Sequence, residues 1–365
     1  MKDIIFAQNK EKGEVFLKQL MGKKPLFVCV IGVTETAKIP GISAAGKNPE
    51  LTDYTPPADV ELILFGRCKC ISGVPITPEG IPTPALITKA ALKLADIPAL
   101  VVSGGLKIKP QAPFVELGGS PGKDIRTGNA VEAVEEVLEK AIVMGRNLAK
   151  TTDYLVISES IPGGTTTALG VLLAMGVNAE GKVSSSMPNN PHKLKIETVK
   201  AGLEASGIKF GALATNPLKA ISCVGDPVMP AFTGLVMGAA DKIPVFMAGG
   251  TQMSAMLAII KALKPDVLDN LAIGTTRWII SDKSADLVGL VKQIAEIPVL
   301  AINLDFSSSK FEGLKAYENG AVKEGVGAGG ACIAAILKSN GKISAKKIFI
   351  EIEKAYSQLM RSEVQ

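Results

Sequence analysis

A single histidine, one tryptophan and a low aromatic content exclude several kinds of site from this chain of 365 residues. Aromatic residues make up only 4% of the sequence, which leaves few side chains on which nucleobases could stack. His192 is the one histidine, so zinc sites with several histidines and histidine-based triads are excluded unless His192 itself serves. The net charge of +5 comes mostly from lysines scattered along the chain, which indicates a lysine-rich surface rather than a basic stripe. We therefore expect no nucleic-acid partner.

Disulfide frameworks and membrane segments have equally little support. The five cysteines, an odd number, are dispersed and lie mostly in apolar runs, which favours reduced thiols in a cytoplasmic protein. Cys68 and Cys70 are the only close pair, and without a second pair they indicate buried or half-buried thiols rather than a metal site. The N-terminus lacks a signal-peptide pattern, and no uncharged apolar run reaches the roughly 18–20 residues of a membrane span. We expect neither a bound metal nor a membrane partner.

Small and aliphatic residues are abundant, and the chain is 47% hydrophobic, as is typical of parallel α/β sheets. Short apolar runs alternate with helical patterns, which predicts a mostly parallel sheet with right-handed crossovers. The expected strands are 26–32, 60–66, 99–105, 153–157, 220–225, 244–250, 277–281 and 298–303. The expected helices lie within 1–24, in the residues that end at about 94, and at 131–149, 168–175, 192–205, 251–263 and 284–296. Another, rich in small residues, lies between 225 and 244, and two more follow residue 330.

This pattern predicts a three-layer, Rossmann-like α/β fold with a small helical subdomain built from the two chain ends. We place the nucleotide-binding core at 60–310, and a subdomain from 1–59 and 311–365 that packs on the core and completes the site. Ligands of such folds bind outside the carboxyl ends of the strands. The paired glycines at 104–105, 163–164 and 249–250 all fall at such ends.

The stretch from Ser158 to Met175 is the first candidate site. An apolar run ends at Glu159, Gly163 and Gly164 follow, and three threonines open an apolar, helix-like segment. Glycines allow a tight turn and a close approach to the main chain, and a helix N-terminus favours bound phosphate. The stretch therefore predicts a phosphate site beside a carboxylate. The competing interpretation is an ordinary strand-to-helix turn capped by threonine.

The second candidate is the glycine-rich stretch 322–331. It contains G-x-G-x-x-G at Gly325, Gly327 and Gly330, but a dinucleotide fingerprint needs a buried strand just before it, and residues 317–320 are not strand-like. We interpret the stretch instead as a turn that presents Glu324 ahead of a helix. A solvated glutamate in a flexible loop is the alternative. No G-x-x-x-x-G-K-[ST] motif supports ATP-loop chemistry.

Two isolated carboxylates and phosphate-binding turns permit one economical reaction. Displacing a pyridinium base from a ribose phosphate needs no general acid, because the leaving ring departs neutral. It needs a held phosphate, a positioned sugar and one base that takes a proton from the incoming nitrogen. The composition permits this chemistry without selecting it.

Two motifs carry a resemblance to a known family. Residues 159–166, E-S-I-P-G-G-T-T, resemble the E-M-G-I-G-N-T-T signature of nicotinate-nucleotide:dimethylbenzimidazole phosphoribosyltransferases. Residues 323–328, K-E-G-V-G-A, resemble that family's L-G-E-G-T-G-A-A segment, whose glutamate is its general base. Residues 226–238 and 243–247 resemble the family's helix and following strand. The resemblance covers about residues 80–340, is strongest at the two glutamate motifs, and looks like the archaeal branch of the family.

The resemblance implies a homodimer, without a cofactor, that joins nicotinate mononucleotide to a benzimidazole-like base for cobalamin assembly. It gives Glu324 the role of base, and it places Glu159 near the ribose or phosphate. The implied phosphate and ribose contacts are Gly163, Gly164, Thr165, Thr166, Ser184, Ser185, Gly249, Gly250, Gly325 and Gly327, and the implied base contacts are Pro82, Thr83 and Leu86.

One departure concerns the base pocket. The family has a serine and a glutamate in a segment like G-V-S-x-Y-P-x-E-V-T, whereas residues 80–88 here contain no acid. The identity of the accepted base is therefore open. A nucleotide-binding protein without turnover remains an alternative, and an NAD-dependent oxidoreductase is a weaker one.

Overall fold

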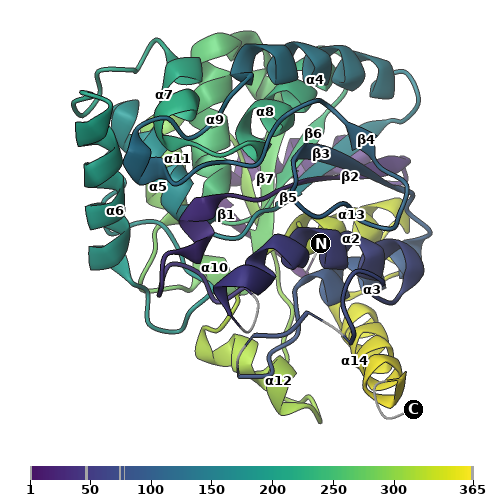
Figure 1. Cartoon of the computed structure of the whole chain (residues 1–365). Coiled ribbons are helices and arrows are strands. Elements are labelled where there is room, and N and C mark those ends of the chain that lie inside the picture. Colours follow the sequence, from purple (N-terminus) through teal and green to yellow (C-terminus); the bar gives the residue numbers. More distant parts are fainter. Residues whose placement is uncertain (1, 46–47, 74, 78, 363–365) are drawn as a thin grey trace.

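The computed structural model describes residues 2–45, 48–73, 75–77 and 79–362, and it contains one sheet between two layers of helices (Figure 1). The eight strands have the order β1-β8-β7-β6-β5-β2-β3-β4, and only β1 runs antiparallel to its neighbour. Their bounds are β1 Ile4–Gln8, β2 Pro25–Gly32, β3 Ala99–Gly105, β4 Val115–Glu116, β5 Tyr154–Ser160, β6 Val245–Ala248, β7 Leu271–Thr276 and β8 Val299–Ile302. The three-layer, mostly parallel α/β fold is confirmed.

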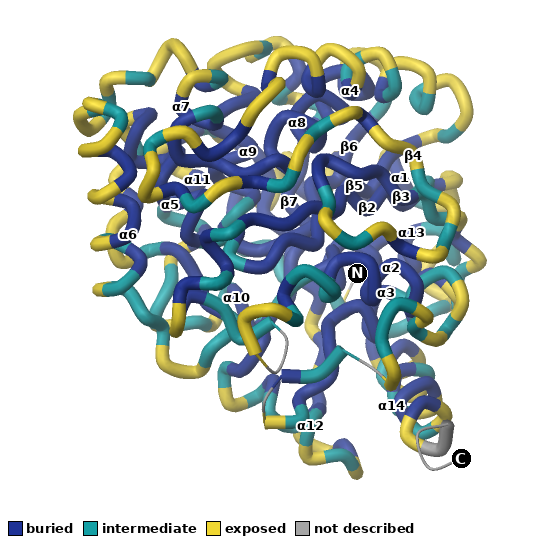
Figure 2. The backbone as a smooth tube through the Cα atoms, in the orientation of Figure 1, coloured by how far each residue is buried: buried dark blue, intermediate teal, exposed yellow. Residues whose placement is uncertain are grey.

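Two apolar clusters, one on each face of the sheet, hold the layers together. Alternate residues of β2 point to opposite faces, so that Val28 and Val30 join one cluster and Phe27 and Cys29 the other. The first face is covered by α4 Val134–Leu148, α5 Gly164–Ala174, α6 His192–Ala205, α7 Pro217–Val224, α8 Val228–Ala239, α9 Gln252–Leu263 and α11 Leu287–Ile294. The second is covered by α1 Lys10–Leu20, α2 Thr55–Phe65, α3 Ala85–Ala95, α13 Ala328–Lys338 and α14 Ala345–Ser362. Figure 2 shows the buried strands between these layers.

The predicted strand at 60–66 is wrong, because this segment belongs to the helix α2. Pro56 and Pro57 lie in its first turn, where proline is tolerated, and Gly66 ends it in the left-handed conformation at φ 75°. The apolar run looked like a strand because most of α2 is buried, and a short apolar run does not distinguish the two structures.

Two further predicted strands are also helices. Residues 220–225 lie mostly in α7, whose N-cap Asn216 accepts a hydrogen bond from the amide of Lys219. Residues 277–281 fall largely in the short helix α10 Arg277–Ile280, and the strand is β7, directly before it. The remaining helical segments are α12 Glu312–Lys315 and 3₁₀ turns at Glu35–Lys38, Pro49–Tyr54, Ile125–Thr127, Pro265–Asn270 and Ala316–Asn319.

The N-terminal segment contributes to the sheet itself. The prediction of helix within 1–24 holds for α1, but the residues before it form the edge strand β1, with Ile4 opposite Ile302 of β8. The central strand β2 also lies within 1–59. The division into a 60–310 core and a subdomain from both chain ends stays a prediction, and its N-terminal part includes two strands of the common sheet.

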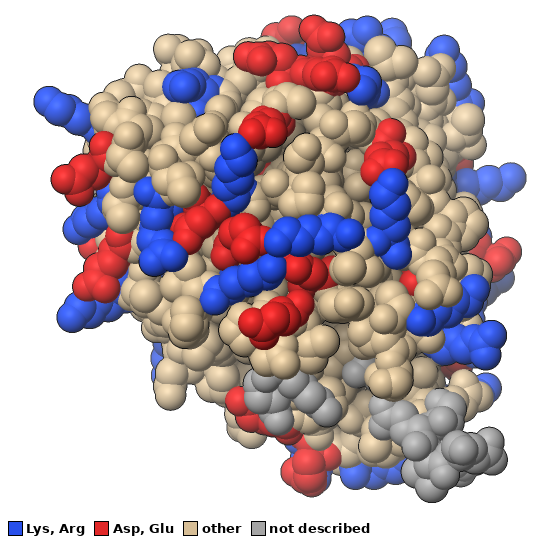
Figure 3. Space-filling view, viewed as in Figure 1, with Lys and Arg blue, Asp and Glu red and all other residues tan. Residues whose placement is uncertain are grey.

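Charged side chains are interspersed on the face in Figure 3, where lysines and arginines alternate with aspartates and glutamates. Among the described residues, no helix has the length and apolar character that a membrane span requires.

Candidate active site

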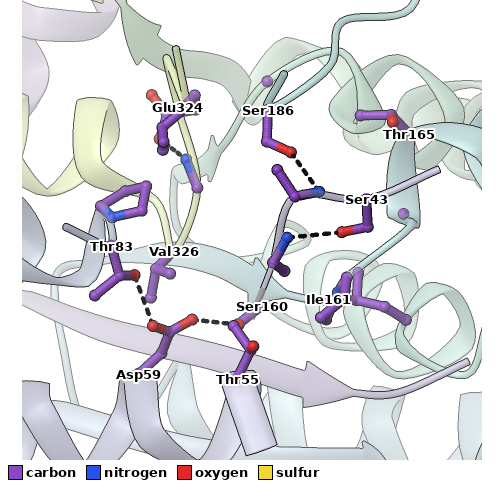
Figure 4. Close-up of a pocket in the computed structure, with 18 of the residues that line it drawn as sticks. Ser43, Thr55, Asp59, Thr83, Ser160, Ile161, Thr165, Ser186, Glu324 and Val326 are labelled. Carbon is purple, nitrogen blue, oxygen red and sulfur yellow. Dashed lines mark hydrogen bonds between the residues drawn. The ribbon is translucent and has the colours of Figure 1, made fainter. Parts of the chain in front are cut away.

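A cavity opens at the carboxyl ends of the central strands, where the chain order of the sheet reverses. From β2 the chain continues to β3 and β4 on one side, whereas β5 begins the series that runs to β8 on the other. Such a switch point is the usual ligand-binding position in an open α/β sheet. The wall is built from several loops (Figure 4). Residues 42–45, 75–77, 81–84, 159–165, 184–186 and 324–326 contribute to it, together with Thr55, Asp59, Gly250, Gln252, Ile279 and Val322.

Most of the residues predicted from the sequence meet in this cavity. The wall includes Glu159, Gly163, Gly164, Thr165, Ser184, Ser185, Gly250, Glu324, Gly325, Pro82 and Thr83. The other four predicted residues, Thr166, Gly249, Gly327 and Leu86, are not on the wall as the structure describes it. Segments separated by more than 200 residues are thus brought to one place by the sheet.

Glu159 is the penultimate residue of β5 and is 3% exposed. Its Oε2 accepts a hydrogen bond from the amide of Ile161 at 3.0 Å, and Gln252 donates to its Oε1 at 3.3 Å. Burial raises the pKa of Glu159 to about 8, and the nearby carboxylates Asp226 and Glu324 add to the shift. A carboxyl in this state can exchange a proton near neutral pH.

Glu324 precedes α13 and turns its carboxylate onto the N-terminus of that helix. It accepts hydrogen bonds from the amides of Gly329 at 3.2 Å and Gly325 at 3.2 Å. Burial nevertheless raises the pKa of Glu324 to about 8, against the lowering effect of these amides. The prediction of a carboxylate on a glycine turn before a helix therefore agrees with the geometry.

The loop around Glu324 has a strained backbone. Val322, Lys323 and Val326 have φ values of 61°, 68° and 53°, in the left-handed region that β-branched and bulky residues rarely adopt. Such strain persists only where the surroundings fix the chain, and it is concentrated at functional sites. Glu324 lies within this segment, so the fixed backbone of the loop sets the point from which its side chain extends.

Buried contacts hold this loop in place. The amide of Val322 donates to the carbonyl of Ser186 at 2.8 Å, and Thr276 donates to the carbonyl of Lys323 at 2.6 Å. The ammonium group of Lys323 pairs with Asp282 at 2.7 Å, and the two side chains are only 2% and 8% exposed. This pair links the loop to Asp282, and separating the two groups would leave a buried charge without a partner.

The glycines of the G-x-G-x-x-G stretch have a packing role. A Cβ atom on Gly330 would lie 2.4 Å from the Cβ of Ala248, and one on Gly327 would lie 2.5 Å from the Cβ of Ser158. These glycines let α13 approach β5 and β6 closely, and no β-strand of the described structure directly precedes them. The sequence feature that suggested a dinucleotide is accounted for by helix–sheet packing.

The turn at 163–166 offers a side-chain hydroxyl as a donor, whereas a helix N-terminus is expected to bind phosphate through main-chain amides. The amides of Gly164 and Thr166 already donate within the turn, to Ile161 and Gly163. Thr165 lies on the cavity wall, and its hydroxyl accepts a hydrogen bond from Lys195 at 3.0 Å. A hydroxyl that accepts from an ammonium keeps its own hydrogen for another partner.

Lys195, on α6, is the residue at this end of the cavity that the sequence did not indicate. It is fully buried, and besides Thr165 it contacts the carbonyl of Ser184 at 2.5 Å. Burial, followed by the neighbouring charge of Lys323, lowers the pKa of Lys195 to about 7. An anion bound at Thr165 and Ser184 would favour the charged form of this lysine.

Asp59 supplies a carboxylate that residues 80–88 lack. It lies on α2 and is 2% exposed, and its Oδ1 and Oδ2 accept hydrogen bonds from Thr83 and Ser160, each at 2.7 Å (Figure 4). Burial raises the pKa of Asp59 to about 6, while these two hydroxyls lower it. All three side chains line the cavity. In the residues that the structure describes, no cluster of three or more histidine, cysteine, aspartate or glutamate side chains is placed to hold a metal ion.

Comparison with known proteins places the chain in a family. Residues 87–284 match the sequence model of a family described as "Phosphoribosyltransferase". A UPF0284 protein of Methanosarcina acetivorans is 49% identical over 85% of this chain and 88% of its own length. Another from Methanothermobacter thermautotrophicus is 46% identical over 88% and 90%, and one from Pyrococcus furiosus is 46% identical over 92% and 99%.

Two solved structures from Thermus thermophilus share the fold. The protein titled CobT has a TM-score of 0.62 at 15% identity, and the match covers 94% of this chain and 92% of that one. The one titled as a nicotinate-nucleotide-dimethylbenzimidazole phosphoribosyltransferase has a TM-score of 0.55 at 16% identity, over 87% and 83%. The sequence resemblance described above is thereby confirmed, and the chain belongs to the phosphoribosyltransferase family.

Proposed function

We propose that this protein transfers the 5-phosphoribosyl group of nicotinate mononucleotide to a nitrogen base and releases nicotinate. With dimethylbenzimidazole, the product would be α-ribazole 5′-phosphate, for cobalamin nucleotide-loop assembly. The observation that supports this most is the placement of Glu324 and of the 163–165 turn on the wall of one cavity. The base-accepting carboxylate and the phosphate-binding elements of such a reaction are therefore within reach of one bound nucleotide.

In the proposed reaction, an unprotonated ring nitrogen of the base attacks C1′ of the ribose. The bond between C1′ and the pyridinium nitrogen breaks, and its electron pair neutralises the departing nicotinate ring. The other ring nitrogen of the base loses its proton to Glu324. Thr165, Ser184 and Ser185 hold the phosphate, with Lys195 behind them, and Glu159 positions the ribose.

The test is nicotinate release from nicotinate mononucleotide in the presence and absence of benzimidazole, with the product identified by mass spectrometry. Glu324→Gln keeps the shape of the side chain but cannot accept the proton, so turnover should fall roughly 10²–10⁴-fold while nucleotide affinity is retained. Glu312→Gln, an exposed change on α12, is the matched control and should leave turnover unchanged. Wild-type turnover in Glu324→Gln would remove Glu324 from the role of base.

A protein that binds the nucleotide without turnover would behave differently in the same experiment. Calorimetry would detect nicotinate mononucleotide binding, while no base would stimulate nicotinate release. The homodimer stays a prediction from the resemblance, and the cytoplasmic location stays a prediction from the cysteine pattern. A monomer by light scattering at micromolar concentration would contradict the dimer.

A further inference from the structure

The floor of the cavity beside Glu324 is made of three groups that can only accept hydrogen bonds. The single hydroxyl hydrogens of Thr83 and Ser160 are both directed to Asp59, at 2.7 Å each. A hydroxyl has one hydrogen, so these two have none left for a ligand, and an ionised carboxylate has no donor at all. With a pKa of about 6, Asp59 is ionised at pH 7.5.

This acceptor group lies at the Glu324 end of the cavity. Thr88 of the same segment donates to the carbonyl of Val326 at 2.8 Å, and a Cβ atom on Gly325 would lie 3.2 Å from Pro84. The segment that contains Thr83 is therefore packed on the Glu324 loop. Figure 4 shows Thr83 and Val326 between Glu324 and Asp59.

We propose that the accepted base is a nitrogen heteroaromatic with an N–H or O–H donor on the ring remote from the attacking nitrogen, and that Asp59, Thr83 and Ser160 receive this donor. The inference rests on the proposed function, because it assigns the far ring of the base to the cavity floor beyond Glu324. A methyl group there would cover the carboxylate and the two hydroxyl oxygens without supplying a donor, and removing polar groups from water without a compensating hydrogen bond is unfavourable. Sites built to bind a polar hydrogen reject analogues that lack it.

The alternative is that Asp59 has only a structural role and links α2, β5 and the start of α3. This alternative predicts a different result for base binding. A structural link fixes the fold but has no preference among ligands of equal shape. The comparison therefore needs pairs of bases that differ only in the donor. Two pairs meet this need, because an amino group and a methyl group have similar size: 5-aminobenzimidazole with 5-methylbenzimidazole, and adenine with 6-methylpurine. The two pairs also show whether the favoured donor is on a benzimidazole or on a purine.

Binding and turnover are measured separately at pH 7.5. Base affinity is measured by calorimetry, in which each base is titrated into the Glu324→Gln protein with nicotinate mononucleotide bound, so that turnover does not interfere. The wild-type rate of nicotinate release gives kcat/KM for each base. We expect the amino member of at least one pair to be favoured by roughly tenfold or more in both measurements. Equal affinity within both pairs would overturn the inference, whatever the turnover. Absence of turnover with all four bases would instead contradict the proposed function.

Variants of the floor test the assignment to these residues. In Asp59→Asn the side-chain NH₂ donates to one of the two hydroxyls, whose own hydrogen is then free to donate into the cavity. The ratio of affinities for the amino and methyl bases should therefore fall towards one. Ser160→Ala removes one acceptor and should reduce the preference without changing Asp59. Asp226→Asn is the matched control. Asp226 is as buried as Asp59 and also accepts a hydrogen bond from a threonine hydroxyl, that of Thr167, but it does not line the cavity as the structure describes it. An unchanged preference in both floor variants, or the same loss in the control, would refute the assignment.

Discussion

Glu159 and Glu324 line one cavity, and the charge of Glu324 contributes to the raised pKa of Glu159, after burial and the charge of Asp226. Both groups have pKa values near 8. Two carboxyls that repel each other in this way do not both ionise readily at neutral pH, and they titrate as a coupled pair. This relationship determines how rate and stability should depend on pH.

The rate of nicotinate release should rise with pH up to about 8. Glu324 must be ionised to accept a proton, and below its pKa of about 8 its ionised fraction falls roughly tenfold per pH unit. A profile of kcat at saturating nicotinate mononucleotide between pH 6 and 9.5 measures this, because kcat does not include the proton uptake by Lys195 that accompanies nucleotide binding. Glu159→Gln removes the neighbouring charge and should move the profile to lower pH. A flat wild-type profile would contradict the assignment of Glu324 as base.

Stability should show the cost of burying these carboxylates. The pKa of Glu159 rises from an ordinary value of 4.5 to about 8 in the folded protein, so its contribution is favourable at low pH and is lost as the pH rises through 8. Glu159→Gln cannot ionise. We therefore expect its melting temperature, relative to wild type, to increase between pH 5 and pH 9. A difference that is constant over this range would show that Glu159 has an ordinary pKa.

The Lys323–Asp282 pair should couple loop stability to activity. Removing one partner leaves a buried charge alone, so Lys323→Met should cost about 3–5 kcal/mol of unfolding free energy. Adding Asp282→Asn removes the orphaned charge and should recover much of this loss. Chemical denaturation of both single variants and the double variant gives the coupling energy. Additive effects would mean that the pair does not hold the loop, and turnover of the double variant shows how far Glu324 depends on it.

The sequence predicted the parts of this structure that have strong local signals. The β-branched runs of β2 and β5 and the amphipathic helices α4 and α6 were expected close to their observed positions. The strand β7 was missed because Gly274 and two threonines interrupt its apolar run. The helix α2 was also predicted wrongly. Because most of it is buried, its sequence lacks the alternation of apolar and polar residues at helical spacing that distinguishes a helix from a strand.

The candidate site was predicted where glycines and a carboxylate adjoin in sequence, and missed where residues meet only after folding. Asp59 was overlooked because the following segment was expected to be a strand. Lys195 is one of several lysines in and near α6, and only the packing of α6 against α5 distinguishes it from exposed Lys193. No local pattern identifies one buried lysine among exposed ones.

Lys195 provides the last prediction, which concerns the phosphate. Its ammonium donates to Thr165 and to the carbonyl of Ser184, and burial lowers its pKa to about 7. At pH 8 most of this lysine is therefore uncharged in the free protein. A dianionic phosphate bound at Thr165 stabilises the charged form, so binding of nicotinate mononucleotide should take up a proton.

Calorimetry at pH 8 in two buffers of different ionisation enthalpy measures this uptake directly. Lys195→Met should abolish it and weaken nicotinate mononucleotide binding by roughly 10–100-fold, the usual worth of a hydrogen bond to a charged group. Nicotinate riboside, which lacks the phosphate, should bind both proteins equally. Lys193→Met, on the same helix with a side chain 90% exposed, should change neither quantity. Equal loss of riboside and mononucleotide affinity in Lys195→Met would mean that the residue maintains the shape of the cavity, whereas proton uptake that persists in that variant would assign the titration to another group.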